Sequence, residues 1–105
     1  MPLSNPSQVS VNLTPPASTT STASSAAATL TSSTVVSATA SRKGLTIWNN
    51  STANLYLDFG SSPTISNYAV KVNAGGYYEV PYSYTRCVGG VWDGTGGSAL
   101  FREFT

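Results

Sequence analysis

The sequence contains no histidine and only one cysteine, Cys87. One cysteine excludes a disulfide within the chain. A zinc site needs a cluster of cysteine or histidine ligands, which the chain does not have. A catalytic cysteine needs a neighbouring base, most often histidine. We therefore interpret Cys87 as a structural thiol on a strand and expect no bound metal and no cofactor.

Charge is also scarce, with nine charged residues among 105 and a net charge of +1. A nucleic-acid binder normally shows a basic patch, which this composition does not provide. No apolar run approaches the ~20 residues that span a membrane. The first residues lack the basic segment and apolar core of a signal peptide. We expect synthesis in a cytoplasm, with neither nucleic acid nor a membrane as partner.

Reaction chemistry is hard to build from the remaining polar residues. The four carboxylates are Asp58, Glu79, Asp93 and Glu103, and nothing in the sequence selects a pair held about 5–10 Å apart, as glycosidases require. The loop 93–97, DGTGG, lacks the alternating acidic ligands of a calcium loop and the lysine of a phosphate loop. We interpret it as a hairpin turn and expect neither catalytic residues nor a small-molecule substrate. A small hydrolase, with two carboxylates converging in one pocket, is the third hypothesis.

The first 41 residues carry no charge, and 18–41 are almost entirely Ser, Thr, Ala and Val. Such a segment has too little apolar area to fold by itself. Two stretches nevertheless favour extended structure: a period-two alternation over 9–13 and a β-branched run over 30–36. We predict that 1–41 is an extended arm that pairs with the sheet edge of a partner, the alternative being a loose tail. The expected anchors are Val9, Val11, Leu13, Leu30, Val35 and Val36.

From residue 42 onward, short alternating runs are separated by turns rich in Asn, Gly and Pro. Leu45 and Ile47 alternate with Thr46 and Trp48. We expect Leu55, Leu57 and Phe59 to face the core, because they alternate with Asn54, Tyr56 and Asp58. No stretch shows an apolar stripe at helical spacing. The pattern predicts that 42–105 is a compact all-β domain, a small antiparallel β-sandwich or barrel of about six or seven short strands.

A domain this small buries only about 60% of its unfolded surface and often depends on partner subunits for stability. Its aromatic residues, which include Trp48 and Trp92, fill the core or an interface more often than they bind sugars. Tyr77 and Tyr78 are neighbours on one predicted strand and therefore point to opposite faces. We expect one of these two rings to be exposed or to lie at an interface.

Six segments of the chain form a recognisable set: RKGLTI at 42–47, NNSTANLY at 49–56, GGYYEVP at 75–81, GVWD at 90–93, GSA at 97–99 and EFT at 103–105. Together they resemble a group of small virion proteins of tailed bacteriophages. The resemblance covers about residues 28–105 and is greatest to the capsid cement, or decoration, proteins of cyanophages. These motifs consist of turn and core residues, and the resemblance carries no catalytic residue.

The resemblance implies a structural protein, not an enzyme, that is made in the cytoplasm of a host bacterium. It would bind the outer capsid surface as a homotrimer and stabilise contacts between capsomers of the major capsid protein. The alternative is a tail, connector or baseplate module that binds a host glycan or another virion protein. That alternative predicts aromatic rings in one exposed groove, and burial of both Trp48 and Trp92 would argue against it.

Overall fold

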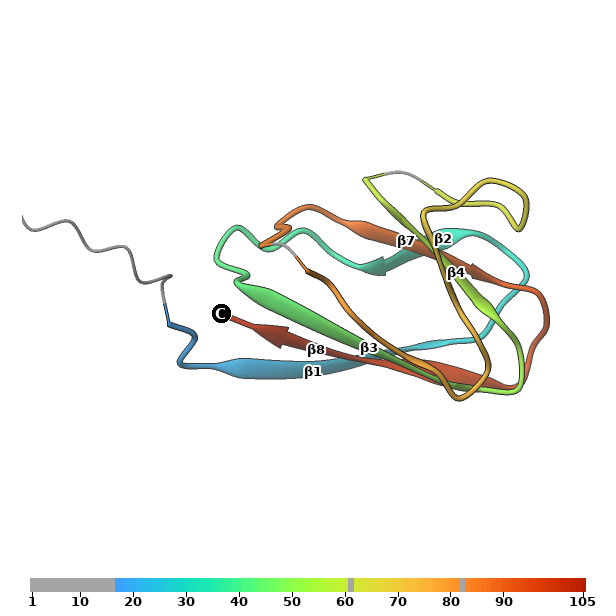
Figure 1. The fold of residues 1–105 in the computed structure, drawn as a ribbon, viewed down its shortest axis with the longest axis horizontal. Helices are drawn as coiled ribbons and strands as arrows, with labels where there is room; N and C mark the ends of the chain where they lie inside the picture. The colour runs from blue at the N-terminus through green and yellow to red at the C-terminus, as the bar shows by residue number, and fades with distance from the viewer. Residues whose placement is uncertain (1–16, 61, 82) are drawn as a thin grey trace, which may run out of the picture.

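The computed structural model describes residues 17–60, 62–81 and 83–105 (Figure 1). These residues form eight β strands and no helix. The strands are β1 (Ser21–Ala27), β2 (Ser33–Val36), β3 (Gly44–Ser51), β4 (Leu55–Phe59), β5 (Val70–Val72), β6 (Tyr77–Glu79), β7 (Val88–Trp92) and β8 (Gly97–Phe104). The predicted all-β class is confirmed.

The strands build two four-stranded antiparallel sheets that pack as a sandwich (Figure 1). Sheet A has the order β1-β8-β3-β6, and sheet B has the order β2-β7-β4-β5. The chain crosses to the other sheet after each strand except β4, which forms a hairpin with β5. Eight strands in this order make a jelly roll, an architecture built of two Greek keys.

The compact domain begins upstream of the predicted boundary at residue 42. β1 pairs with β8 along its whole length, from Ser21 opposite Phe104 to Ala27 opposite Ser98. β2 pairs with β7, and the register shifts between Thr34 and Val36. Residues 21–36 thus contribute an edge strand to each of the two sheets of their own chain. Their small and β-branched side chains suit edge strands, where little core contact is needed.

The core lies between the sheets and is built from alternate residues of the central strands. Leu45 and Ile47 of β3 face Leu55 and Leu57 of β4, in one cluster that also contains Trp92 of β7. The core-facing positions predicted for Leu55 and Leu57 are confirmed, and Phe59 lies half-buried against the same cluster. Full burial of each such side chain contributes about 1.5–3 kcal/mol.

The connection between β4 and β5 folds over the outer face of sheet B (Figure 1). The ring of Tyr68 meets that of Tyr56 edge to face, with centroids 4.7 Å apart. Tyr56 and Val91 point outward from sheet B, yet both are buried. Asp93 holds Tyr56 from the other side by accepting a hydrogen bond from its hydroxyl at 3.2 Å. The outer face of sheet B is therefore largely covered by the chain itself.

Two glycines with positive φ, Gly75 in a turn and Gly97 at the start of β8, provide a test of backbone crowding. Gly97 has φ +91°, and a Cβ there would lie 2.7 Å from the backbone oxygen of Asn50. Gly75 has φ +77°, but a Cβ there would meet nothing within 4 Å. We expect Gly75→Ala to lower the free energy of unfolding by about 1 kcal/mol, the cost of the left-handed conformation. Gly97→Ala should cost about 2–3 kcal/mol, because the clash adds to that strain. Urea unfolding measures both values, and equal losses would contradict the role of crowding.

Candidate interaction surface

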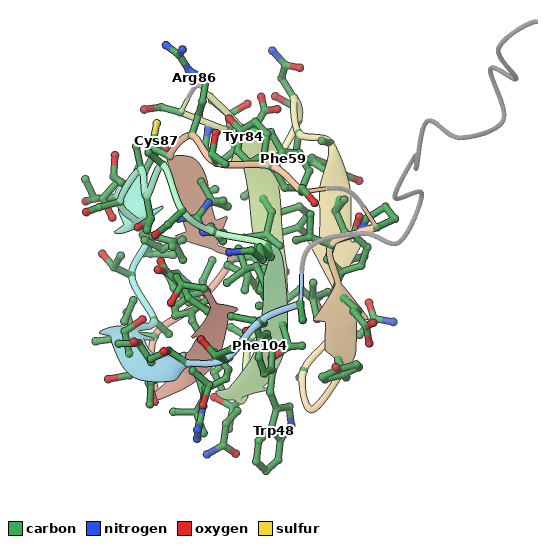
Figure 2. The ribbon with its side chains drawn as sticks, turned by 90° about the vertical axis from the view of Figure 1, so that its left-hand side faces the viewer. Trp48, Phe59, Tyr84, Arg86, Cys87 and Phe104 are labelled. Atoms are coloured by element: carbon green, nitrogen blue, oxygen red, sulfur yellow. The ribbon has the colours of Figure 1, made fainter. Side chains whose placement is uncertain are left out.

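Three apolar side chains form a row across the outer face of sheet A, which none of the described segments covers. Trp48 of β3 lies opposite Tyr77 of β6 on one side and Leu100 of β8 on the other. Residues directly opposite in an antiparallel pair have Cβ atoms about 4.5–5.5 Å apart. All three side chains are exposed to solvent, with exposed fractions of 47% for Trp48, 60% for Tyr77 and 37% for Leu100. Figure 2 shows Trp48 pointing away from the sandwich. We call these three residues the apolar row.

A polar row lies two residues along each strand on the same face. Thr46 is opposite Glu79 on one side and Arg102 on the other. The two rows are linked by the Tyr77 hydroxyl, which donates a hydrogen bond to Glu79 Oε2 at 3.1 Å. Local desolvation of the hydroxyl, and then this hydrogen bond, raise the pKa of Tyr77 above its usual value of 10.0. The hydroxyl is therefore protonated at neutral pH, and the face presents an apolar stripe beside balanced charges.

The apolar row, together with Thr46 and Arg102 of the polar row, borders an open groove of about 610 Å³. Ala23 and Ser24 of β1 form its low wall, while Trp48, Tyr77 and Leu100 form its apolar side. Exposed apolar patches flanked by polar residues are typical of protein and ligand interfaces. The groove can accept the surface of another protein or the face of a sugar ring.

Two other hollows are smaller. One, of about 450 Å³, lies between Leu30 of the β1–β2 connection and Ile65 of the β4–β5 connection. The other, of about 180 Å³, lies among Phe59, Tyr78 and Tyr84, where the rings of Phe59 and Tyr84 meet edge to face. Figure 2 shows these two rings on the opposite side of the sandwich from Trp48.

Of the residues expected to anchor an arm, the three that the structure describes do not form one surface. Val36 is 3% exposed and belongs to the core, because its pairing with Val88 turns it inward. Val35 is half-buried and packs against the core cluster, whereas Leu30 is exposed. Val9, Val11 and Leu13 lie outside the described residues. Of the two tyrosines, Tyr77 belongs to the apolar row and Tyr78 packs half-buried against the core.

The carboxylates lie at separate places in the fold. Glu79 is on the outer face of sheet A, and Glu103 forms an ion pair with Arg42 at 3.1 Å. Asp93 accepts hydrogen bonds from the backbone and side-chain nitrogens of Asn54, which lower its pKa. Asp58 accepts a hydrogen bond from the N–H of the next residue.

Within residues 17–60, 62–81 and 83–105, no three His, Cys, Asp or Glu side chains come together as metal ligands. The same residues include no helix that is long and apolar enough to cross a membrane.

Trp48 and Leu100 are members of the apolar row that we did not assign to a surface from the sequence. The signal for Trp48 was present, because Leu45, Ile47 and Asn49 point inward and Trp48 lies between two of them. Leu100 could be placed only once the pairing of β8 with β3 was known. Comparison of the chain with protein-family models, with curated proteins and with solved structures gives no match.

Proposed function

We propose that this chain is a structural protein of a tailed-bacteriophage virion that binds the outer surface of the capsid. It stabilises contacts between neighbouring capsomers of the major capsid protein and is present there as a homotrimer. The observation that carries the proposal is the apolar row, which is exposed on a face that no described part of the chain covers. The phage context comes from the sequence resemblance. Jelly rolls occur in viral capsid proteins and in lectins, so the fold agrees with a virion role without deciding it.

The mechanism is additive burial at many equivalent sites. Tryptophan and tyrosine are enriched among the residues that dominate binding energy at interfaces. Glu79 and Arg102, beside the apolar row, provide opposite charges that orient the contact. Few other charges need to be desolvated, which keeps the cost of binding low. Repetition over a capsid lattice converts a weak contact of each copy into strong overall attachment.

The proposal predicts that Trp48→Ser combined with Leu100→Ser weakens capsid binding at least tenfold. Both side chains are exposed, so their replacement should leave the fold intact. The measurement uses capsids of the phage that encodes the chain, prepared without it, to which purified protein is added. Bound copies are counted by gel densitometry, and capsid disruption is followed by the temperature of DNA release.

Ile65→Ser provides the matched control for this experiment. Ile65 is an exposed apolar residue in the connection that covers sheet B, away from the apolar row. Its replacement should leave both capsid binding and capsid disruption unchanged. Equal binding by the double variant and the control would reject the apolar row as the capsid contact.

A second candidate is favoured by the same groove. Trp48 and Tyr77 are adjacent, exposed and next to hydrogen-bonding groups, an arrangement suited to stacking against sugars. In this case the chain is a tail, connector or baseplate adhesion module that binds a host glycan. Trp92 is fully buried, so Trp48 is the tryptophan whose fluorescence would respond to added oligosaccharides. A response that Trp48→Ser abolishes, together with unchanged capsid binding, would favour this candidate.

A further inference from the structure

We propose that the free edge of β1 pairs with β1 of a second copy of the chain. The two sheets A would then form one continuous antiparallel sheet across a two-fold axis. The inference concerns the edge of sheet A and not its outer face, so it does not rest on the proposed function.

Among the described residues, no strand pairs with the outer side of β1, so this edge offers unpaired backbone groups. β1 is the terminal strand of sheet A and lies at the border of the sandwich (Figure 1). Two hydrogen bonds next to the strand show which residues of β1 bond to β8. Ala28 N–H donates to Gly97 C=O at 3.0 Å, and Thr105 N–H donates to Thr20 C=O at 2.8 Å. Hydrogen-bonded residues alternate along an antiparallel strand. The even-numbered residues of β1 therefore bond to β8, and the odd-numbered residues point their N–H and C=O groups away from the sheet.

β1 lacks the features that keep sheet edges from pairing. Natural edge strands are short, bulged or charged, or contain proline. β5 has three residues and contains Lys71, and β6 has three residues and contains Glu79. β2 has four residues and a register shift. β1 has seven residues in unbroken register, with no charge and no proline. A long edge of this kind is expected to be covered in the working protein.

A second copy of β1 fits this edge because the strand is complementary to itself. In the antiparallel register centred on Ser24, Ala23 lies opposite Ser25 of the second copy, and Ser21 lies opposite Ala27. The odd-numbered residues of the two strands then face each other and can form about eight backbone hydrogen bonds. Every side chain in β1 is Ser, Thr or Ala, so no bulky or like-charged pair meets across the axis. The same operation on β5 would place two lysines together.

The contact should be weak. One strand pair buries less than the ~1,200 Å² of a stable specific interface, so pairing depends on concentration. A two-fold contact of this kind is isologous. In an assembly of trimers, it can join copies only from different trimers.

The experiment measures the mass of the full-length chain by analytical ultracentrifugation over a range of concentrations. We expect the weight-average mass to rise from 10.9 kDa toward twice that value. Ala23→Pro should reduce the association constant at least tenfold, because it removes an outward N–H that β8 does not use. Ala23→Thr keeps that N–H and provides the matched control, with association unchanged.

Hydrogen exchange identifies the surface that pairs. The amides of Ser24 and Ala26 should be protected at all concentrations by β8. Those of Ala23 and Ser25 should become protected only as the mass rises. Continued protection of Ala26 in the Ala23→Pro variant shows that the sheet is intact.

Three results would overturn the proposal. The first is a monomer at every concentration. The second is association that Ala23→Pro does not change, which would indicate another contact surface. The third is concentration-independent protection of Ala23 and Ser25 in a monomer, which would indicate that residues 1–16 cover the edge. None of these results depends on capsid binding, which the apolar-row variants test separately.

Discussion

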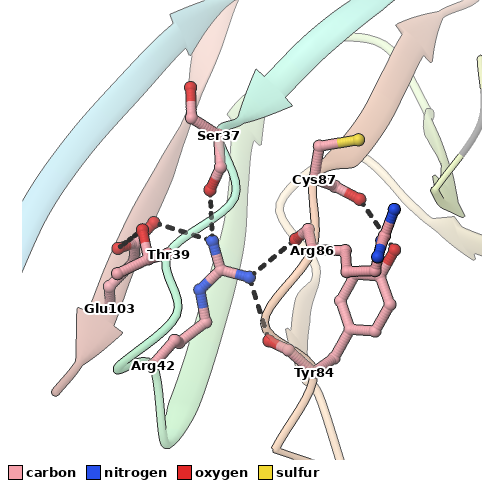
Figure 3. A network of polar contacts seen from close by, with 7 residues as sticks. All are labelled: Ser37, Thr39, Arg42, Tyr84, Arg86, Cys87 and Glu103. Carbon is pink, nitrogen blue, oxygen red and sulfur yellow. Dashed lines mark hydrogen bonds and ion pairs between the residues drawn. The ribbon is translucent and has the colours of Figure 1, made fainter.

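Arg42→Ala is expected to lower the free energy of unfolding by about 3–5 kcal/mol, because it leaves buried acceptors without their donor. Arg42 is 2% exposed. Its Nη1 donates to the carbonyl oxygens of Tyr84 and Arg86, both at 2.9 Å, and its Nη2 donates to Ser37 C=O and to Glu103 Oε1 (Figure 3). A domain of this size has a total stability of about 5–15 kcal/mol. The variant should therefore be close to unfolded at 37 °C, as urea and thermal unfolding followed by circular dichroism would show.

The hydrogen bonds that Arg42 donates form what we call the Arg42 network. Two further variants separate the contribution of these hydrogen bonds to stability from the contribution of the positive charge alone. Arg42→Lys keeps the positive charge but not the planar fork that reaches several acceptors at once, so its loss should be intermediate. Arg102→Ala removes an exposed arginine from the strand that holds Glu103, and its effect should be within about 0.5 kcal/mol. A loss below 1 kcal/mol for Arg42→Ala would mean that water replaces the guanidinium at little cost.

The Arg42 network explains why the boundary of the domain was difficult to place from the sequence. The first charges of the chain appear at residues 42 and 43, which we interpreted as the end of an arm. Arg42 instead fastens together the β2–β3 connection, the β6–β7 connection and the end of β8. Thr39 strengthens the same junction by donating to Glu103 Oε2 at 3.2 Å. A composition change marks a domain boundary only when no contacts cross it.

The all-β class and most of the core were predictable because the central strands contrast strongly between their two faces. The inward face of β3 is marked by Leu45 and Ile47, and that of β4 by Leu55 and Leu57. Neither assignment requires that the partner strands be known. β1 has no such contrast, since each of its residues is Ser, Thr or Ala. Its strand conformation comes from pairing with β8, almost 80 residues away. A local pattern cannot predict a strand that long-range pairing defines.

The candidate surface was predictable only in part, because it too depends on pairing between strands that are distant in the sequence. Adjacent tyrosines on a strand must face opposite ways, so one of Tyr77 and Tyr78 could be expected outside. The sequence could not show that Trp48 and Leu100 lie beside Tyr77, because that depends on the registers of three strands. The β-branched character of Val36 fitted an arm as well as a core strand. Only its pairing with Val88 distinguishes the two.

Asn49→Asp is expected to cost about 3 kcal/mol or more at pH 7, although the two side chains have almost the same shape. Asn49 is fully buried. Its Nδ2 donates to the carbonyl oxygens of Ala53, Val72 and Asn73 at 2.8, 2.9 and 3.1 Å. A carboxylate there would place negative charge against three acceptors and leave a buried ion without a donor on that side. Urea unfolding of the variant gives the loss directly.

The size of this loss should depend on pH. Burial raises the pKa of an introduced carboxyl above its unfolded value of about 3.9. The folded variant then binds more protons than the unfolded chain above about pH 4, so its stability falls as the pH rises from there. Asn50→Asp is the matched control, because Asn50 is the next residue on β3 and is exposed. Asn49→Asp should approach the stability of this control near pH 4 and fall well below it at pH 7. If the two variants were equally stable at pH 7, the amide of Asn49 would not be needed to satisfy the three carbonyl groups that join β3 to the β3–β4 turn and the end of β5.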